Sequence, residues 1–142
     1  MRFMMIVKAN KDSEAGVMPP KEVFEAMGRF NEQMVKAGVM LAGEGLQASS
    51  KGFRVAYSGD KRTVTDGPFS ETKELVAGFW LIQVKSREEA VEWAKRCPFQ
   101  EGELEVRQIF ETADFPSDAL SPEEAAREEA LRQELKRRAA QS

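Results

Sequence analysis

The order of helix-like and strand-like segments is the feature that most constrains the fold of this chain. Residues 20–36 and 87–96 carry apolar side chains at helical spacing, and each begins with a helix signal, a proline at position 20 and a Ser86–Glu89 capping box. Apolar or alternating character predicts strands over residues 3–8, 39–43, 53–57, 63–65, 75–84 and 104–110. The predicted order is therefore β-α-β-β-β-β-α-β, with a short hairpin formed by the third and fourth strands.

This order predicts an α+β domain of the ferredoxin-like type, in which helices cover one face of an antiparallel sheet. Such a sheet has a second face that must be covered. Residues 3–8 and 75–84 carry apolar side chains on both faces. We therefore expect two copies of the chain to form a homodimer.

The last 30 residues differ in character from the rest. We expect the α+β domain to span residues 1–112, followed within residues 113–142 by a linker and an added C-terminal amphipathic helix. Ser121 and Pro122 are typical of a helix start. Acidic residues precede basic ones along this helix, which complements the helix dipole. Favourable i,i+4 pairs are Glu123–Arg127, Glu128–Arg132 and Glu134–Arg138.

Composition excludes several classes of function. Charged residues make up 32% of the chain and the net charge is −3, so no electrostatic footprint for nucleic acid is present. No apolar run approaches the length of about 18 residues that a bilayer span requires. The N-terminus has the character of a strand rather than a signal peptide. The single cysteine, Cys97, cannot form an internal disulfide, which predicts a cytoplasmic protein.

The chain contains no histidine, the usual general base near neutral pH and the commonest transition-metal ligand. A single cysteine also excludes the usual zinc and iron–sulfur ligand sets, so we expect neither a metal nor a cofactor. Carboxylate-only binding of magnesium or calcium stays open as an alternative, although the sequence has no EF-hand loop spacing. Cys97 lies at the predicted C-terminal end of a helix, where the helix dipole disfavours a thiolate. We therefore interpret it as a structural residue, and proton transfer would fall to carboxylates, lysine or tyrosine.

The densest group of polar side chains is the segment Asp66–Glu74, with the sequence DGPFSETKE, between two predicted strands. Its first three residues have turn chemistry. The candidate catalytic carboxylates are Asp66, Glu71 and Glu44. The candidate ligand-binding residues are Phe69, Ser70, Lys73, Glu44 and Gln47. The alternative is a solvated connection, in which Asp66 accepts the Phe69 or Ser70 amide and Lys73 forms ion pairs.

The words Asp66–Phe69 and Glu71–Glu74, with Ala42–Leu46 upstream, closely resemble the DGPF-type members of the YCII-related family over about residues 1–112. The resemblance implies the ferredoxin-like fold and sheet-to-sheet pairing of two copies in a dimeric α+β barrel. Related proteins are associated with a histidine–aspartate pair proposed as an active site. This chain cannot supply the histidine, and Gln47 stands where some relatives have one, which favours ligand binding over acid–base catalysis.

The leading hypothesis is a small cytoplasmic dimeric protein that binds a small polar or anionic ligand near the DGPF segment. One alternative is a lyase- or hydrolase-type enzyme that uses the carboxylates named above. Another is a regulatory accessory protein, because the resemblance includes proteins encoded near extracytoplasmic-function sigma factors. No residue pattern favours direct contact with DNA or a membrane.

Overall fold

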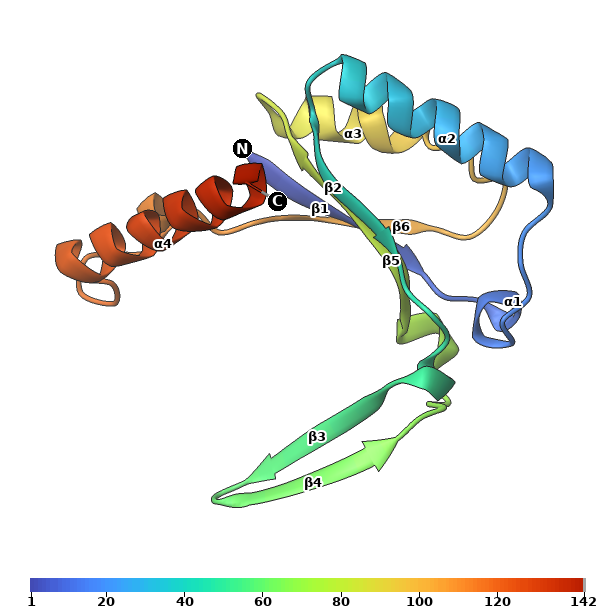
Figure 1. Cartoon of the computed structure of the whole chain (residues 1–142), viewed down its shortest axis with the longest axis horizontal. Coiled ribbons are helices and arrows are strands. Elements are labelled where there is room, and N and C mark those ends of the chain that lie inside the picture. The colour runs from blue at the N-terminus through green and yellow to red at the C-terminus, as the bar shows by residue number, and fades with distance from the viewer. Residues whose placement is uncertain (142) are drawn as a thin grey trace. The chain divides into compact units, whose positions relative to one another are not determined.

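The computed structural model describes residues 1–141 and divides the chain into two compact units, residues 1–108 and residues 109 onward (Figure 1). The first unit is an α+β domain built on a four-stranded antiparallel sheet with the spatial order β2-β5-β1-β6. The strands of this sheet are β1 (Arg2–Lys8), β2 (Met40–Gly45), β5 (Val76–Gln83) and β6 (Leu104–Gln108). The helices of the unit are α1 (Lys11–Glu14), α2 (Lys21–Lys36) and α3 (Arg87–Arg96). The α+β class is thus confirmed.

The core lies between the sheet and the helices α2 and α3, which sit together on one side of it (Figure 1). Met5, Met34 and Ile82 are fully buried there. The rings of Phe30 and Trp80 meet edge to face, with their centroids 5.4 Å apart. The apolar stripes of residues 20–36 and 87–96 supply the helix side of this core, so they predict α2 and α3 correctly.

The other face of the sheet carries a second row of apolar side chains. Met4 is paired with Leu81 and Ile6 with Phe79 across the β1–β5 ladder. Because side chains alternate along a strand, these four point away from the face that α2 and α3 cover. All four are half-buried.

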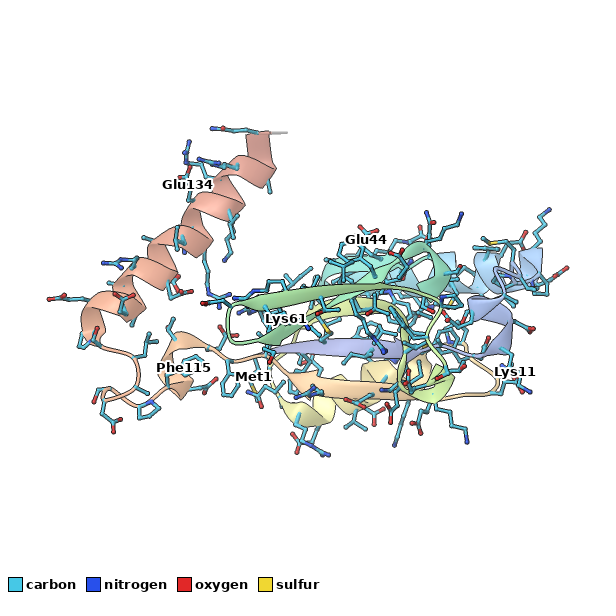
Figure 2. The ribbon with its side chains drawn as sticks, turned by 90° about the horizontal axis from the view of Figure 1, so that it is seen from below. Met1, Lys11, Glu44, Lys61, Phe115 and Glu134 are labelled. Carbon is cyan, nitrogen blue, oxygen red and sulfur yellow. The ribbon has the colours of Figure 1, made fainter. Side chains whose placement is uncertain are left out.

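A separate two-stranded sheet is formed by β3 (Phe53–Ser58) and β4 (Lys61–Asp66), which pair only with each other. The hairpin predicted from the sequence is confirmed, and its second strand is longer than expected. Figure 1 shows this hairpin standing off from the four-stranded sheet, and Lys61 marks the start of β4 in Figure 2. One face of the hairpin is apolar and exposed, with Phe53 at 65% and Tyr57 at 72%.

The segment between β1 and α2 contains the short helix α1, which the sequence did not indicate. Asn10 caps it through a reciprocal pair of bonds: Ser13 N donates to Asn10 Oδ1 at 2.8 Å, and Asn10 N donates to Ser13 Oγ at 2.9 Å. The Ser86 cap also differs in detail. Ser86 Oγ accepts from Glu89 N, but Glu89 returns its bond to the amide of Lys85.

The second unit contains a 3-10 turn, η3 (Thr112–Asp114), and the long helix α4 (Pro122–Gln141), on which Figure 2 labels Glu134. The predicted start is confirmed, because Ser121 Oγ accepts from Glu124 N at 3.2 Å. The predicted pair of Glu134 with Arg138 is confirmed at 2.9 Å. Arg127, however, pairs with Glu124 at 3.0 Å rather than with Glu123. No helix within residues 1–141 is long and apolar enough to cross a bilayer.

Candidate functional site

A cavity of about 860 Å³ lies beside the sheet in the first unit. Its walls come from the N-terminal half of α2, the segment from α1 to Pro19, and residues 46–51 after β2. Its floor is formed by residues of β2 and β5. Small-molecule sites commonly occupy about 300–1,000 Å³ and are mostly apolar. Most of the side chains lining this cavity are apolar, so its size and lining suit a small organic molecule.

Three glycines form part of the floor, and only two of them are required by packing. A side chain at Gly43 would start 2.7 Å from the indole of Trp80, and one at Gly78 would start 2.8 Å from the carbonyl oxygen of Glu44. At Gly45 an added Cβ meets no atom within 4 Å, and its φ is not positive. A glycine inside a strand weakens it, so Gly45 needs a reason other than the fold. Close approach of a ligand to the strand is such a reason.

Aromatic rings and one amide border the deep part of the cavity. The rings of Trp80 and Phe99 lie 6.2 Å apart. Trp80 Nε1 donates a hydrogen bond of 2.9 Å to Asn31 Oδ1. Because the indole nitrogen can only donate, this bond fixes which end of the Asn31 amide is oxygen. The NH₂ group of Asn31 is left available beside the cavity.

Glu14 on α1 is tied to residue 49 on the facing wall. Both the amide and the hydroxyl of Ser49 donate to its carboxylate, the amide at 2.8 Å. These bonds, the hydroxyl first, hold the pKa of Glu14 below its usual range. Glu14 is therefore charged at neutral pH and joins two walls of the cavity.

The same serine anchors the DGPF segment. Phe69 N donates to Ser49 Oγ at 3.0 Å, and Gly67 N donates to Gly52 O at 3.0 Å. A side chain at Gly67 would start 1.9 Å from the carbonyl oxygen of Ser49, so only glycine allows this close approach. Of the two donors expected for Asp66, the amides of Phe69 and Ser70, the Phe69 amide is taken by Ser49 instead, so that part of the expectation is wrong.

Two other residues of the segment brace the base of the hairpin. The Arg54 guanidinium lies over the Phe69 ring, 3.8 Å from its centroid, and pairs with Glu71 at 3.5 Å. Both charged side chains are about half exposed, with relative accessibilities of 52% and 49%, so the ion pair is worth little by itself. Phe69 and Glu71 thus have structural contacts that their sequence context did not indicate.

The structure divides the candidate residues into two groups. Glu44 and Gln47 line the cavity, and Glu44 is labelled on β2 in Figure 2. Alternation along β2 directs the Glu44 side chain to the face opposite Gly45. The remaining candidates, which do not line the cavity, are Asp66, Phe69, Ser70, Glu71 and Lys73. All of these except Phe69 are exposed.

Sequence reasoning missed Asn31 and Gly45 as cavity residues. Asn31 is a polar side chain four residues after Met27 and three before Met34, on the apolar stripe of α2. A polar residue within the apolar stripe of a helix is the sequence feature that indicates a candidate cavity residue here. Gly45 has no signal in its local sequence, because the open space above it depends on residues of β5 and α2.

A second cavity, of about 460 Å³, lies between α3 and the connection to β6 and is lined in part by Cys97. Burial raises the pKa of the Cys97 thiol to about 11. The thiol is therefore uncharged at neutral pH, as expected of a structural cysteine. Within residues 1–141, no group of three or more potential metal-ligating side chains is gathered to hold an ion.

Two comparisons with known proteins bear on this domain. The model of the YCII-related domain matches residues 1–113. An uncharacterized protein of Rhizobium meliloti (strain 1021) is 28% identical over 102 residues, which cover 68% of this chain and 82% of the relative. The family match includes every residue that lines the cavity and the whole segment 66–74.

Proposed function

The chain belongs to the YCII-related family, and we propose that it binds a small organic molecule in the cavity between α2 and the central sheet. The observation that carries this proposal is the open space above Gly45, a strand glycine that neither packing nor backbone geometry requires. The cavity volume of about 860 Å³ and its apolar lining support it.

Binding is better supported than acid–base catalysis. A carboxylate becomes a useful base near neutral pH when burial or a like charge raises its pKa. Asp66, Glu71 and Glu44 are all exposed, and Glu71 is paired with Arg54. None of these three therefore has the enclosed setting that the enzyme hypothesis needs.

We propose further that the first unit is ferredoxin-like and acts as a cytoplasmic homodimer. The order β2-β5-β1-β6, with α2 and α3 each following a strand and preceding another, supports that topology. The apolar row of Met4, Ile6, Phe79 and Leu81 supports pairing of two copies sheet to sheet in an α+β barrel.

Filling the cavity tests the binding proposal. Gly45→Leu should place a side chain where no atom lies within 4 Å of the new Cβ. Compounds that raise the Tm of the wild-type protein in a fragment screen should lose that effect in the variant. The variant itself should be as stable as wild type, or more stable by up to about 1 kcal/mol, because a strand glycine is removed.

Gly28→Leu is the matched control. Gly28 is an exposed residue of α2 that does not line the cavity, and an added Cβ there also meets no atom within 4 Å. This variant should keep the wild-type ligand response. If ligands stabilise Gly45→Leu as much as wild type, they bind elsewhere and the proposal is wrong.

A further inference from the structure

The most informative polar group beside the cavity is the amide of Asn31. It is half-buried on the face of α2 that also presents Met27 and Met34. Placing an amide among apolar side chains is costly unless its hydrogen bonds are made. The oxygen is satisfied by Trp80 Nε1 at 2.9 Å. Within residues 1–141 no acceptor is paired with the NH₂ group.

The Trp80 bond leaves Asn31 with a single chemical role toward a ligand. The indole N–H cannot accept, so the amide cannot turn its nitrogen toward Trp80 without losing the bond. The group presented to the cavity is then a hydrogen-bond donor, and a ligand must answer it with an acceptor oxygen or nitrogen.

Charge decides between a neutral and an anionic acceptor. Glu14 and Glu44 are the acidic residues that line the cavity, and Lys51 is the basic one. Because the Glu44 side chain points to the opposite face of β2, the carboxylate that a ligand meets is that of Glu14, which Ser49 holds in the wall. This carboxylate repels a ligand carboxylate or phosphate, and the Lys51 ammonium attracts it only weakly because it is exposed and screened by water and salt. An uncharged acceptor, such as a carbonyl oxygen, fits the donor without this repulsion.

The shape of the floor favours a flat molecule. At Gly45 the strand presents backbone without a side chain, so a ligand face can lie directly against it. The Trp80 ring covers Gly43 on one side, and Phe99 lies beside it. Aromatic and conjugated molecules offer the flat apolar faces that such a surface contacts best.

We propose that this cavity takes a flat, uncharged carbonyl compound, an aromatic or conjugated ketone, lactone or amide. Its carbonyl oxygen accepts a hydrogen bond from the Asn31 NH₂ group, and its apolar face lies against β2 at Gly45. The inference rests on the binding function proposed above and narrows it to one ligand class. It differs from the expectation of a small polar or anionic ligand near the DGPF segment, both in the charge of the ligand and in its place.

Three matched probes test the class: 1-indanone, indane and the anion 1-indanecarboxylate. Titration of the full chain, followed by NMR of the Gly45 amide, the Asn31 side-chain amide and the Trp80 Nε1–H, locates and measures binding. The ketone should bind most tightly, roughly tenfold better than the hydrocarbon, since one hydrogen bond distinguishes them. The anion should bind most weakly.

Asn31→Asp separates recognition from structure. A carboxylate oxygen still accepts from Trp80 Nε1, but the donor is gone and a second acceptor faces the ligand carbonyl. We expect 1-indanone to bind roughly tenfold more weakly and indane to bind unchanged. A retained Trp80 Nε1–H resonance would show that the fold around the indole is intact.

Three contrary outcomes are distinguishable. If all three probes shift Gly45 with equal affinity, or if Asn31→Asp leaves the preference for the ketone unchanged, the cavity binds ligands but the proposed class is wrong. If the anion binds best, the charge argument is overturned. If no probe shifts Gly45 in the wild-type protein and a broader fragment screen also fails there, the binding function itself is overturned.

Discussion

At the scale of single residues, Ser49 holds together more of the candidate site than any residue of the DGPF segment. Its hydroxyl donates to Glu14 on α1 and accepts the amide of Phe69. Its carbonyl lies where only Gly67 can approach it. The polar side chains that make the segment conspicuous in the sequence mostly point into solvent, and the structural bonds run through its backbone.

Ser49→Ala should lower the free energy of unfolding by about 1–2 kcal/mol, because the Phe69 amide and the Glu14 carboxylate each lose a partner. Asp66→Ala should change it by less than about 0.5 kcal/mol, since Ser49 already holds the loop amide. Urea denaturation measures both. Ser70→Ala, an exposed serine of the same segment, is the control. If Asp66→Ala lowered the free energy of unfolding as much as Ser49→Ala does, Asp66 would hold the loop and this prediction would be wrong.

Cys97 gives a pH-dependent prediction. Burial raises the pKa of its thiol to about 11, so the reactive thiolate becomes more abundant as pH increases. The rate of alkylation by iodoacetamide should rise about tenfold per pH unit through pH 10 and level off only near 11. The same chain unfolded in urea should level off in the ordinary thiol range, and a plateau below pH 9 in the folded protein would contradict the burial of the thiol.

At the scale of elements, the sequence predicts what depends on local periodicity and fails where an element depends on its neighbours. The apolar stripes of residues 20–36 and 87–96 become α2 and α3 almost to the residue. The single turn of α1 has no apolar stripe, and the bonds between Asn10 and Ser13 that cap it are not part of any apolar periodicity. The bond from Phe69 to Ser49 crosses 20 residues of sequence, and no spacing rule reaches that far.

The hairpin β3–β4 is an element with no partner strand. An isolated two-stranded hairpin is marginally stable in water. The contacts of Gly67 with Gly52 and of Arg54 with Phe69 close its base, and the bonds of Ser49 with Phe69 and Glu14 connect that base to α1. Val64 of this hairpin is 63% exposed. The exposed apolar side chains of the hairpin are therefore available for contacts outside the first unit.

At the scale of the whole molecule, the apolar row on the sheet face opposite α2 and α3 predicts the assembly. Light scattering at micromolar concentration should give twice the chain mass of 15.9 kDa. Leu81→Lys places a charge on the face opposite α2 and α3 and should produce a folded monomer, because an unpaired ammonium cannot be buried cheaply. Val35→Lys, on an exposed position of α2, should remain dimeric. A wild-type monomer under these conditions would contradict the dimer.

The open space above Gly45 also predicts an outcome of directed evolution. A strand glycine keeps more conformational freedom in the unfolded chain than any other residue would, so the domain carries a standing stability cost there. Selection for heat resistance alone, with no ligand present, would favour larger residues at this position. Each substitution that raises Tm in this way would also fill the cavity. Selection for stability and selection for ligand binding would therefore favour different residues at position 45.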